Sequence, residues 1–212
     1  MNLLGFLIAA SAAPSETAVR WVAMSSEYRA VCEQTYAAAA EKVLAVAAKT
    51  DQPWAIVMDV DETVLNNMQY QVELNAKGES HSQEAWEKWV KRKESPPVPG
   101  VKAFIRKLRK VPGGRIIFLS NRYAHNTELT RQNLGAHGMV EKVDVFLFRK
   151  VRTDKKSIRR QEVFDGSGRM GVYGKLKVLA WFGDSAHDFP EGDGLKWGRE
   201  KFMLPNPVYG SW

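Results

Sequence analysis

The chain has 212 residues, enough for one domain or for one domain that carries a small insertion. Hydrophobic residues make up 44% of it and charged residues 26%, which excludes a disordered or a collagen-like chain. The formal net charge of +7 fits either an anionic partner, from a phosphate-bearing metabolite to nucleic acid, or a solvated basic surface.

The single cysteine limits the kinds of site that the chain can hold, and the apolar N-terminus bears on where the protein is located. Cys32 excludes an internal disulfide, a cysteine-rich zinc site and a dithiol redox motif. Residues 1–13 form an apolar run that ends in Ala10-Ser11-Ala12, which is similar to a signal-peptidase site, although the usual basic start is missing. The run is too short to span a bilayer, and we expect no transmembrane segment. We therefore expect an exported protein, periplasmic or at the cell surface, with a clipped signal segment over 1–13 and one domain over 14–212.

The periodicity predicts one long helix over 17–49. Apolar residues recur there at three- and four-residue spacing and form one packed stripe. The stripe consists of Tyr28, Val31, Cys32, Thr35, Ala39, Val43 and Val46. The sequence Asp51-Gln52-Pro53 ends the helix.

The rest of the chain alternates between continuous apolar strands and helices. Strands are predicted over 54–58, 116–119, 145–148 and 178–182, with helices between them. This pattern predicts an α/β fold with a Rossmann-like parallel sheet and helices on both faces. The polar segment 66–99 contains no strand and only one helical patch, around Trp86 and Trp89, so we expect it to be a small helical cap over the strand ends.

Polar side chains follow three of these strands, and parallel strands bring such ends together. The groups are Asp59 with Asp61, then Ser120-Asn121-Arg122, then Asp184 with Asp188. A carboxylate at a strand end can attack a phosphorus atom, while a second carboxyl exchanges a proton with the leaving oxygen and then with water. The clustered carboxylates would repel a phosphate dianion unless a cation were present. Mg²⁺ fits that role because it prefers oxygen ligands. The order of the three groups therefore predicts a magnesium-dependent phosphohydrolase with Asp59 as nucleophile.

Other residues are candidates for contacts with the substrate. Ser120 and the Asn121 backbone would hold a phosphoryl oxygen, and Lys155 or Lys156 would neutralise the charge of the transferring group. Arg122 suits a phosphate contact or a surface ion pair. Trp89 and Tyr209 suit stacking on an aromatic leaving group or packing in the protein.

With these motifs, the chain resembles the haloacid dehalogenase superfamily and, within it, the class C acid phosphatases, whose best-known members are bacterial surface lipoproteins with 5'-nucleotidase activity. The resemblance rests on the two aspartate pairs and extends from about Val19 to Trp212. Its further segments are 26–30, 86–90, 97–101, 119–122 and 204–212.

The resemblance implies roles for individual residues. Asp59 is the nucleophile and Asp61 the acid–base catalyst. The metal is held by the Asp59 carboxylate, the Asp61 carbonyl and Asp184, while Asp188 supports its waters or the lysine. The lysine motif 156–160 selects Lys156.

The activity that the resemblance implies is hydrolysis of small phosphate monoesters, with nucleoside 5'-monophosphates as candidates and no specific nucleic-acid partner. The alternative is a non-enzymatic or nucleic-acid-binding protein that keeps the fold, supported by the basic run 149–156. Ser185 stands where the family commonly has Asn, and the substrate stays open, as does the oligomeric state, a homodimer included.

Overall fold

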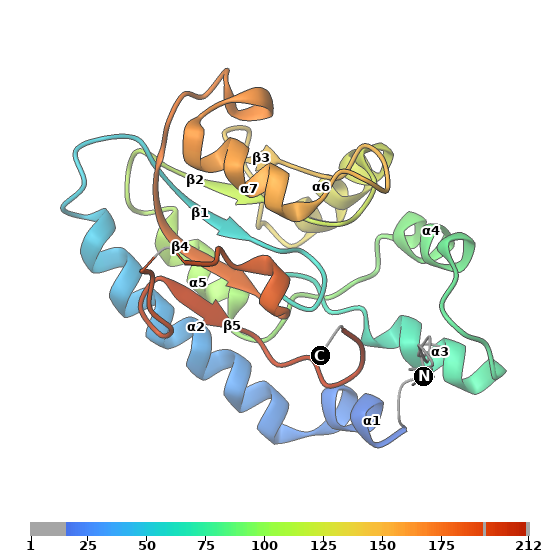
Figure 1. Cartoon of the computed structure of the whole chain (residues 1–212). Helices are drawn as coiled ribbons and strands as arrows, with labels where there is room; N and C mark the ends of the chain where they lie inside the picture. The colour runs from blue at the N-terminus through green and yellow to red at the C-terminus, as the bar shows by residue number, and fades with distance from the viewer. Residues whose placement is uncertain (1–15, 193, 211–212) are drawn as a thin grey trace, which may run out of the picture.

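A computed structural model of the chain describes residues 16–192 and 194–210; the predicted signal segment 1–13 lies outside these ranges. Its centre is a five-stranded sheet with the order β3-β2-β1-β4-β5 (Figure 1). The strands are β1 (Trp54–Met58), β2 (Gly114–Phe118), β3 (Val145–Phe146), β4 (Lys177–Gly183) and β5 (Lys201–Met203). All neighbouring strands are parallel, so the predicted α/β parallel sheet is confirmed.

Helices lie on both faces of this sheet (Figure 1). The α-helices are α1 (Glu16–Met24), α2 (Ser26–Ala47), α3 (Met68–Lys77), α4 (Gln83–Arg92), α5 (Val101–Leu108), α6 (Thr127–Ala136) and α7 (Lys156–Asp165). Short 3-10 helices are η1 (Ala124–Asn126), η2 (Gly168–Met170) and η3 (Ala186–Asp188). Within residues 16–192 and 194–210, none of the helices combines the length and apolarity that a membrane crossing requires.

The central strand β1 is buried on both sides, which explains its continuous apolar sequence. Ile56 and Met58 point into the core cluster that contains residues of α2 and α5. Ala55 and Val57 point into a second cluster, which contains Val163 of α7. Because alternate residues serve opposite faces, no polar residue is tolerated until the strand ends.

The predicted N-terminal helix is wrong in two respects. It is broken at Ser25, whose extended backbone and side chain cap α2 by accepting a hydrogen bond from the Tyr28 backbone N–H at 3.0 Å. Val31 and Val46 are 42% and 46% exposed, so they do not belong to the packed stripe. The buried face instead includes three residues outside the predicted stripe. These are Tyr36, Ala40 and Ala47.

The predicted cap segment folds as two helices, α3 and α4, where the sequence predicts one helical patch, and their small apolar cluster also contacts Leu129 of α6. Its two ends meet beside the sheet. Leu65 forms an antiparallel bridge with Pro97, the Asn66 backbone N–H donates to Pro96 O at 2.8 Å, and the Val98 backbone N–H donates to Val64 O at 3.0 Å. The segment therefore leaves the domain and returns at one point, as an insertion does.

Candidate active site

The residues predicted at the strand ends lie on three neighbouring strands. Asp59 directly follows β1 and Asp184 directly follows β4, while Ser120 lies two residues beyond β2. The ladder continues past β1, because the Asp59 backbone N–H donates to Phe182 O at 2.9 Å. The order of the strands thus brings the three motifs to one edge of the sheet.

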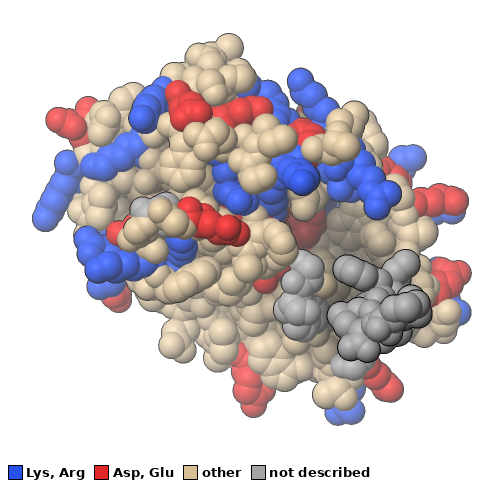
Figure 2. Space-filling view, viewed as in Figure 1, with Lys and Arg blue, Asp and Glu red and all other residues tan. Residues whose placement is uncertain are grey.

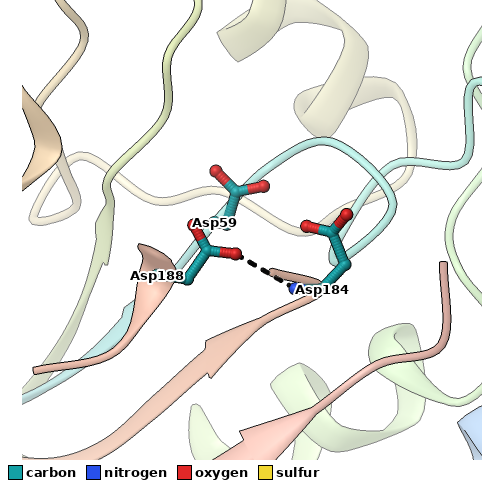
Figure 3. A group of neighbouring side chains, drawn as sticks. All are labelled: Asp59, Asp184 and Asp188. Carbon is teal, nitrogen blue, oxygen red and sulfur yellow. Dashed lines mark hydrogen bonds between the residues drawn. The ribbon is translucent and has the colours of Figure 1, made fainter. Parts of the chain in front are cut away.

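Three carboxylates gather at this edge (Figure 3). Asp59, Asp184 and Asp188 each offer an oxygen within 4.8 Å of the others. Lys156, the first residue of α7, lies against them: its ammonium donates to Asp59 Oδ1 at 2.5 Å and also to Asp188 Oδ1. The neighbouring Lys155 is exposed, so the structure places Lys156 and not Lys155 beside the acids.

The fourth motif places Asp188 by folding back on the end of β4. Asp188 Oδ2 accepts a hydrogen bond from the backbone N–H of Asp184 at 3.1 Å, dashed in Figure 3, and another from the backbone N–H of Ser185 at 3.0 Å. Ser185 and Asp188 also form a capping box around η3. Gly183 makes room for this turn, because a Cβ there would lie 2.6 Å from Asp188 Cγ. The short η3 turn therefore aims Asp188 at Lys156.

Burial and charge perturb the ionisation of this group. Burial raises the pKa of Asp59 well above its usual value; Lys156 opposes this rise, while the nearby acids, led by Asp188, add to it. Burial and Asp188 raise the pKa of Asp184 to about 7. Burial would lower the pKa of Lys156, but the carboxylates of Asp59 and Asp188 outweigh it and raise the pKa. The lysine is thus held in its charged form.

The donor set fits a divalent cation. With all three carboxyls ionised, the Lys156 ammonium would leave two negative charges unbalanced, and one divalent ion would balance them. Each of the three residues offers a carboxylate oxygen, and oxygen is the ligand atom that Mg²⁺ prefers. Asp184 is also fixed from outside the cluster, because Asn206 Nδ2 donates to its Oδ2 at 2.7 Å.

Asp61 is not part of this cluster and has other partners. Arg122 donates to its Oδ1 from Nη2 at 2.7 Å and from Nε at 3.0 Å, and Asn67 Nδ2 donates to the same oxygen at 2.9 Å. Ser120 Oγ lies 3.4 Å from Asp61 Oδ2. The two aspartates of the first motif therefore have different partners, as two different chemical roles require.

The loop after β2 is fixed from behind by Arg159. This buried guanidinium donates to Ser120 O at 2.5 Å, to Leu147 O at 2.9 Å and to Asn121 Oδ1 at 2.7 Å. Ser120 itself is buried, and its Oγ accepts the Arg122 backbone N–H at 3.1 Å. These hydrogen bonds tie the loop after β2 to α7, which carries Arg159, and to the segment after β3.

The remaining predicted contacts lie further from the acids. Trp89 is 3% exposed in the cluster of α3 and α4, and its indole N–H donates to Asn67 Oδ1 at 2.8 Å, so its placement favours packing over stacking on a ligand. Tyr209 is half-buried against the main core. Its backbone N–H donates to Asn206 Oδ1 at 3.3 Å, which ties it to the residue that holds Asp184. A contact of Tyr209 with substrate stays a prediction.

Four residues of the site were not singled out from the sequence. Thr63, whose Oγ1 lies 3.5 Å from Asp184 Oδ1, belongs to the first motif. Arg159 lies in the lysine motif and Asn206 in the C-terminal segment 204–212, so both were inside recognised segments without a role. Asn67 lies six residues after Asp61, and the sequence marks it only as the neighbour of Asn66, which stands where the family more commonly has an acid, without a role for Asn67 itself.

Lys and Arg side chains border the hollow near the centre of Figure 2, and acidic atoms lie inside it. Such an arrangement attracts anions toward an acidic interior that needs a cation to receive them. It fits a phosphate-bearing ligand.

Comparisons with known proteins agree with this geometry. The family model "HAD superfamily, subfamily IIIB (Acid phosphatase)" matches residues 2–212. The structure is similar to the class C acid phosphatase of Bacillus anthracis, with a TM-score of 0.76 and 25% identity over 92% of this chain and 84% of that one. The same enzyme with tungstate bound gives a TM-score of 0.77 and 26% identity over the same shares.

A curated relative is the stem 31 kDa glycoprotein of Glycine max, 28% identical over 158 residues, or 72% of this chain. The match spans 58% of that relative's length. Since the family model covers nearly the whole sequence, the chain belongs to subfamily IIIB of the HAD superfamily, the acid phosphatases, which are phosphoric monoester hydrolases.

Proposed function

We propose that the protein is a Mg²⁺-dependent acid phosphatase that hydrolyses small phosphate monoesters, nucleoside 5'-monophosphates among them, through an aspartyl-phosphate on Asp59. The observation that carries this proposal is the contact of the Lys156 ammonium with Asp59 inside a buried cluster of acids, beside a separately held Asp61. That arrangement supplies a nucleophile, a fixed positive charge and a proton donor at one edge of the sheet.

The reaction has two displacements at phosphorus. A carboxylate oxygen of Asp59 forms a bond to phosphorus while the bond to the leaving oxygen breaks, and Asp61 gives that oxygen a proton. Asp61, now ionised, takes a proton from water as the water attacks the aspartyl-phosphate and releases inorganic phosphate. Asp59 is regenerated, and the loop with Ser120 and Asn121 would hold the phosphoryl oxygens.

Asp59, Asp184 and Asp188 would hold or surround the magnesium ion, with the Asp61 carbonyl as the further ligand that the family resemblance implies. When bound, the ion offsets the charge of the carboxylates and of the phosphate. Lys156 keeps Asp59 in place and adds a second positive charge that does not depend on the ion.

The preference for small esters rests on the cap. Helices α3 and α4 stand beside the strand ends, where a long polymer would be crowded (Figure 1). Nucleoside 5'-monophosphates are proposed from the resemblance to class C enzymes, with Tyr209 as the candidate aromatic contact. Export to the periplasm or cell surface is proposed from the segment 1–13.

A panel of phosphate esters, assayed with magnesium and with EDTA, tests the proposal. We expect EDTA and Asp59→Asn each to abolish phosphate release, and Asp165→Asn, a change to an exposed aspartate of α7, to leave it unchanged. We also expect an acidic optimum, because Asp61 must carry a proton when the leaving group departs. Wild-type turnover in Asp59→Asn, or salt-sensitive binding of polynucleotide without turnover, would contradict the proposal and favour the nucleic-acid-binding alternative.

A further inference from the structure

Arg122 forms the closest set of contacts with the side chain of Asp61. Its Nη2 lies 2.7 Å from Asp61 Oδ1, and its Nε lies 3.0 Å from Oδ1 and 3.2 Å from Oδ2. The Arg122 side chain is 2% exposed and that of Asp61 19%. Such a two-nitrogen contact fixes the plane of the carboxylate as well as its position.

We propose that Arg122 is a positioning residue that aims the Asp61 carboxyl at the leaving oxygen of the substrate, and that it does not contact the phosphate. This inference rests on the proposed function, and it revises the substrate contact that the sequence predicts for Arg122. The positioning role follows from the acceptors to which the guanidinium of Arg122 donates its hydrogen bonds.

All three nitrogens of Arg122 already have partners. Nε and Nη2 bind Asp61, and Nη1 donates to Thr130 Oγ1 of α6 at 2.9 Å. Thr130 Oγ1 is fixed in turn, because it donates to Asn126 O at 2.9 Å. The guanidinium also lies over the ring of Trp86 in the cap, 5.5 Å from its centre. With each nitrogen engaged and 2% of its side chain exposed, Arg122 offers little access to a phosphate.

Asn67 supplies a second contact that comes from the cap side. Its Nδ2 donates to Asp61 Oδ1, while its Oδ1 accepts from Trp89 Nε1 at 2.8 Å and from Ser95 Oγ at 2.8 Å. Trp89 and Ser95 belong to the inserted segment. The orientation of Asp61 is therefore set by the cap and by the loop after β2 together.

The two oxygens of Asp61 are left unequal. Oδ1 accepts from Asn67 and twice from Arg122, while among residues 16–192 and 194–210 the partners of Oδ2 are more distant, Arg122 Nε at 3.2 Å and Ser120 Oγ at 3.4 Å. A proton is carried more readily by the oxygen that accepts fewer N–H groups. Oδ2 is thus the oxygen whose O–H bond breaks as the leaving oxygen gains its proton.

Substrates with different leaving groups separate this role from a phosphate contact. A 2,4-dinitrophenolate departs without a proton, whereas an alkoxide needs one. We expect Arg122→Lys to slow the burst of 2,4-dinitrophenol release less than about threefold and to lower kcat for an alkyl phosphate by about tenfold or more, within the range of general acid catalysis. The inhibition constant of tungstate should stay within about twofold of the wild-type value, since the phosphate site is untouched.

Arg109→Lys is the matched control, because Arg109 forms a comparable ion pair with the buried Asp144, with Nη2 2.5 Å from Oδ2, at the start of β3 and not at the carboxyl ends of the strands. It should lower stability without changing the ratio of the two substrates. If Arg122→Lys does not fold, Thr130→Val tests the same point, because it removes the hydrogen bond of Nη1, together with the one that Thr130 Oγ1 donates to Asn126 O, and leaves the contacts of Arg122 with Asp61 in place. It should shift the substrate ratio in the same direction by a smaller factor.

An equal loss with both substrates, or a tungstate inhibition constant raised tenfold or more, would overturn the positioning role and restore a phosphate contact. An unchanged substrate ratio in both Arg122→Lys and Thr130→Val would also overturn it. Absence of phosphate release by the wild-type enzyme would instead overturn the proposed function and this inference with it.

Discussion

Gly183 offers a direct test of how the fourth motif is built. It is the last residue of β4, and Asp188 folds back directly over it. A Cβ at this position would lie 2.6 Å from Asp188 Cγ, whereas real Cβ contacts essentially never fall below 3.0 Å. Gly183→Ala must therefore push Asp188 away from the backbone N–H groups that donate hydrogen bonds to it, and away from Lys156.

The cost of that displacement is of the order that overpacking gives in a packed interior, about 1–3 kcal/mol of unfolding free energy. Turnover should fall on the order of 10²-fold. The reason is that the Lys156 ammonium loses its contact with Asp188 and is then held by Asp59 alone. Urea unfolding measures the first quantity, and steady-state hydrolysis of an aryl phosphate measures the second.

Gly135→Ala is the matched control. Gly135 lies in α6, where an added Cβ would meet Val140 Cγ1 at 3.7 Å, an ordinary contact. Alanine in a helix should stabilise the protein by about 0.5–1 kcal/mol and leave turnover unchanged. The reasoning about the strand end is refuted if Gly183→Ala unfolds within about 0.5 kcal/mol of the wild type and retains its activity.

Three further changes probe the same region. Lys156→Met should lower the free energy of unfolding, measured with urea at pH 7, by about 3–5 kcal/mol, because it leaves the buried Asp59 carboxylate without its partner. The raised pKa of Asp184, about 7 when folded, predicts that stability without metal falls as the pH rises from about 4 to about 7, by on the order of 4 kcal/mol at most. Magnesium should restore stability most above pH 7, and Asp184→Asn should flatten the pH profile of urea unfolding; a profile as steep as that of the wild type would be the contrary result. Tyr36→Phe should cost about 1 kcal/mol in the same assay, because it leaves the buried Thr63 carbonyl without the hydroxyl that donates to it at 2.6 Å.

The sequence predicts the sheet well because its strands are buried on both faces. Continuous runs such as 54–58 and 178–182 are hard to place anywhere else in a soluble domain. The sequence does not predict the edge strand β5, because β5 has no long apolar run. It has only three residues and begins with Lys201, so neither its length nor its composition distinguishes it from a loop.

The helix register shows the limits of periodicity. Val31 and Val46 are apolar and correctly spaced, yet they lie one position away from the residues that face the sheet. Apolar alternatives next to each other, as in the alanine-rich part of α2, leave the direction of the buried face undetermined by about one residue. Only packing against α5 and the sheet selects it.

The acids and the lysine of the site are predictable because they are fixed by their own strands and by a helix start. Lys156 is the first residue of α7 and Lys155 its N-cap, so the two side chains diverge even though they are neighbours in sequence. Contacts between distant loops are not predictable in this way. Arg122 and Asp61 are 61 residues apart, and nothing local to either residue indicates the other.

The partners of Asp59 and Asp61 explain how one short motif provides two different carboxyls. Asp59 is buried among acids and held by the ammonium of Lys156, and in the proposed reaction it meets the phosphorus atom there. Asp61 is held by Arg122 and Asn67, which belong to the loop after β2 and to the start of the cap. A change in the cap would thus reach Asp61 without touching Asp59. The leaving-group dependence of the rate should therefore vary with the cap, while the identity of the nucleophile should not.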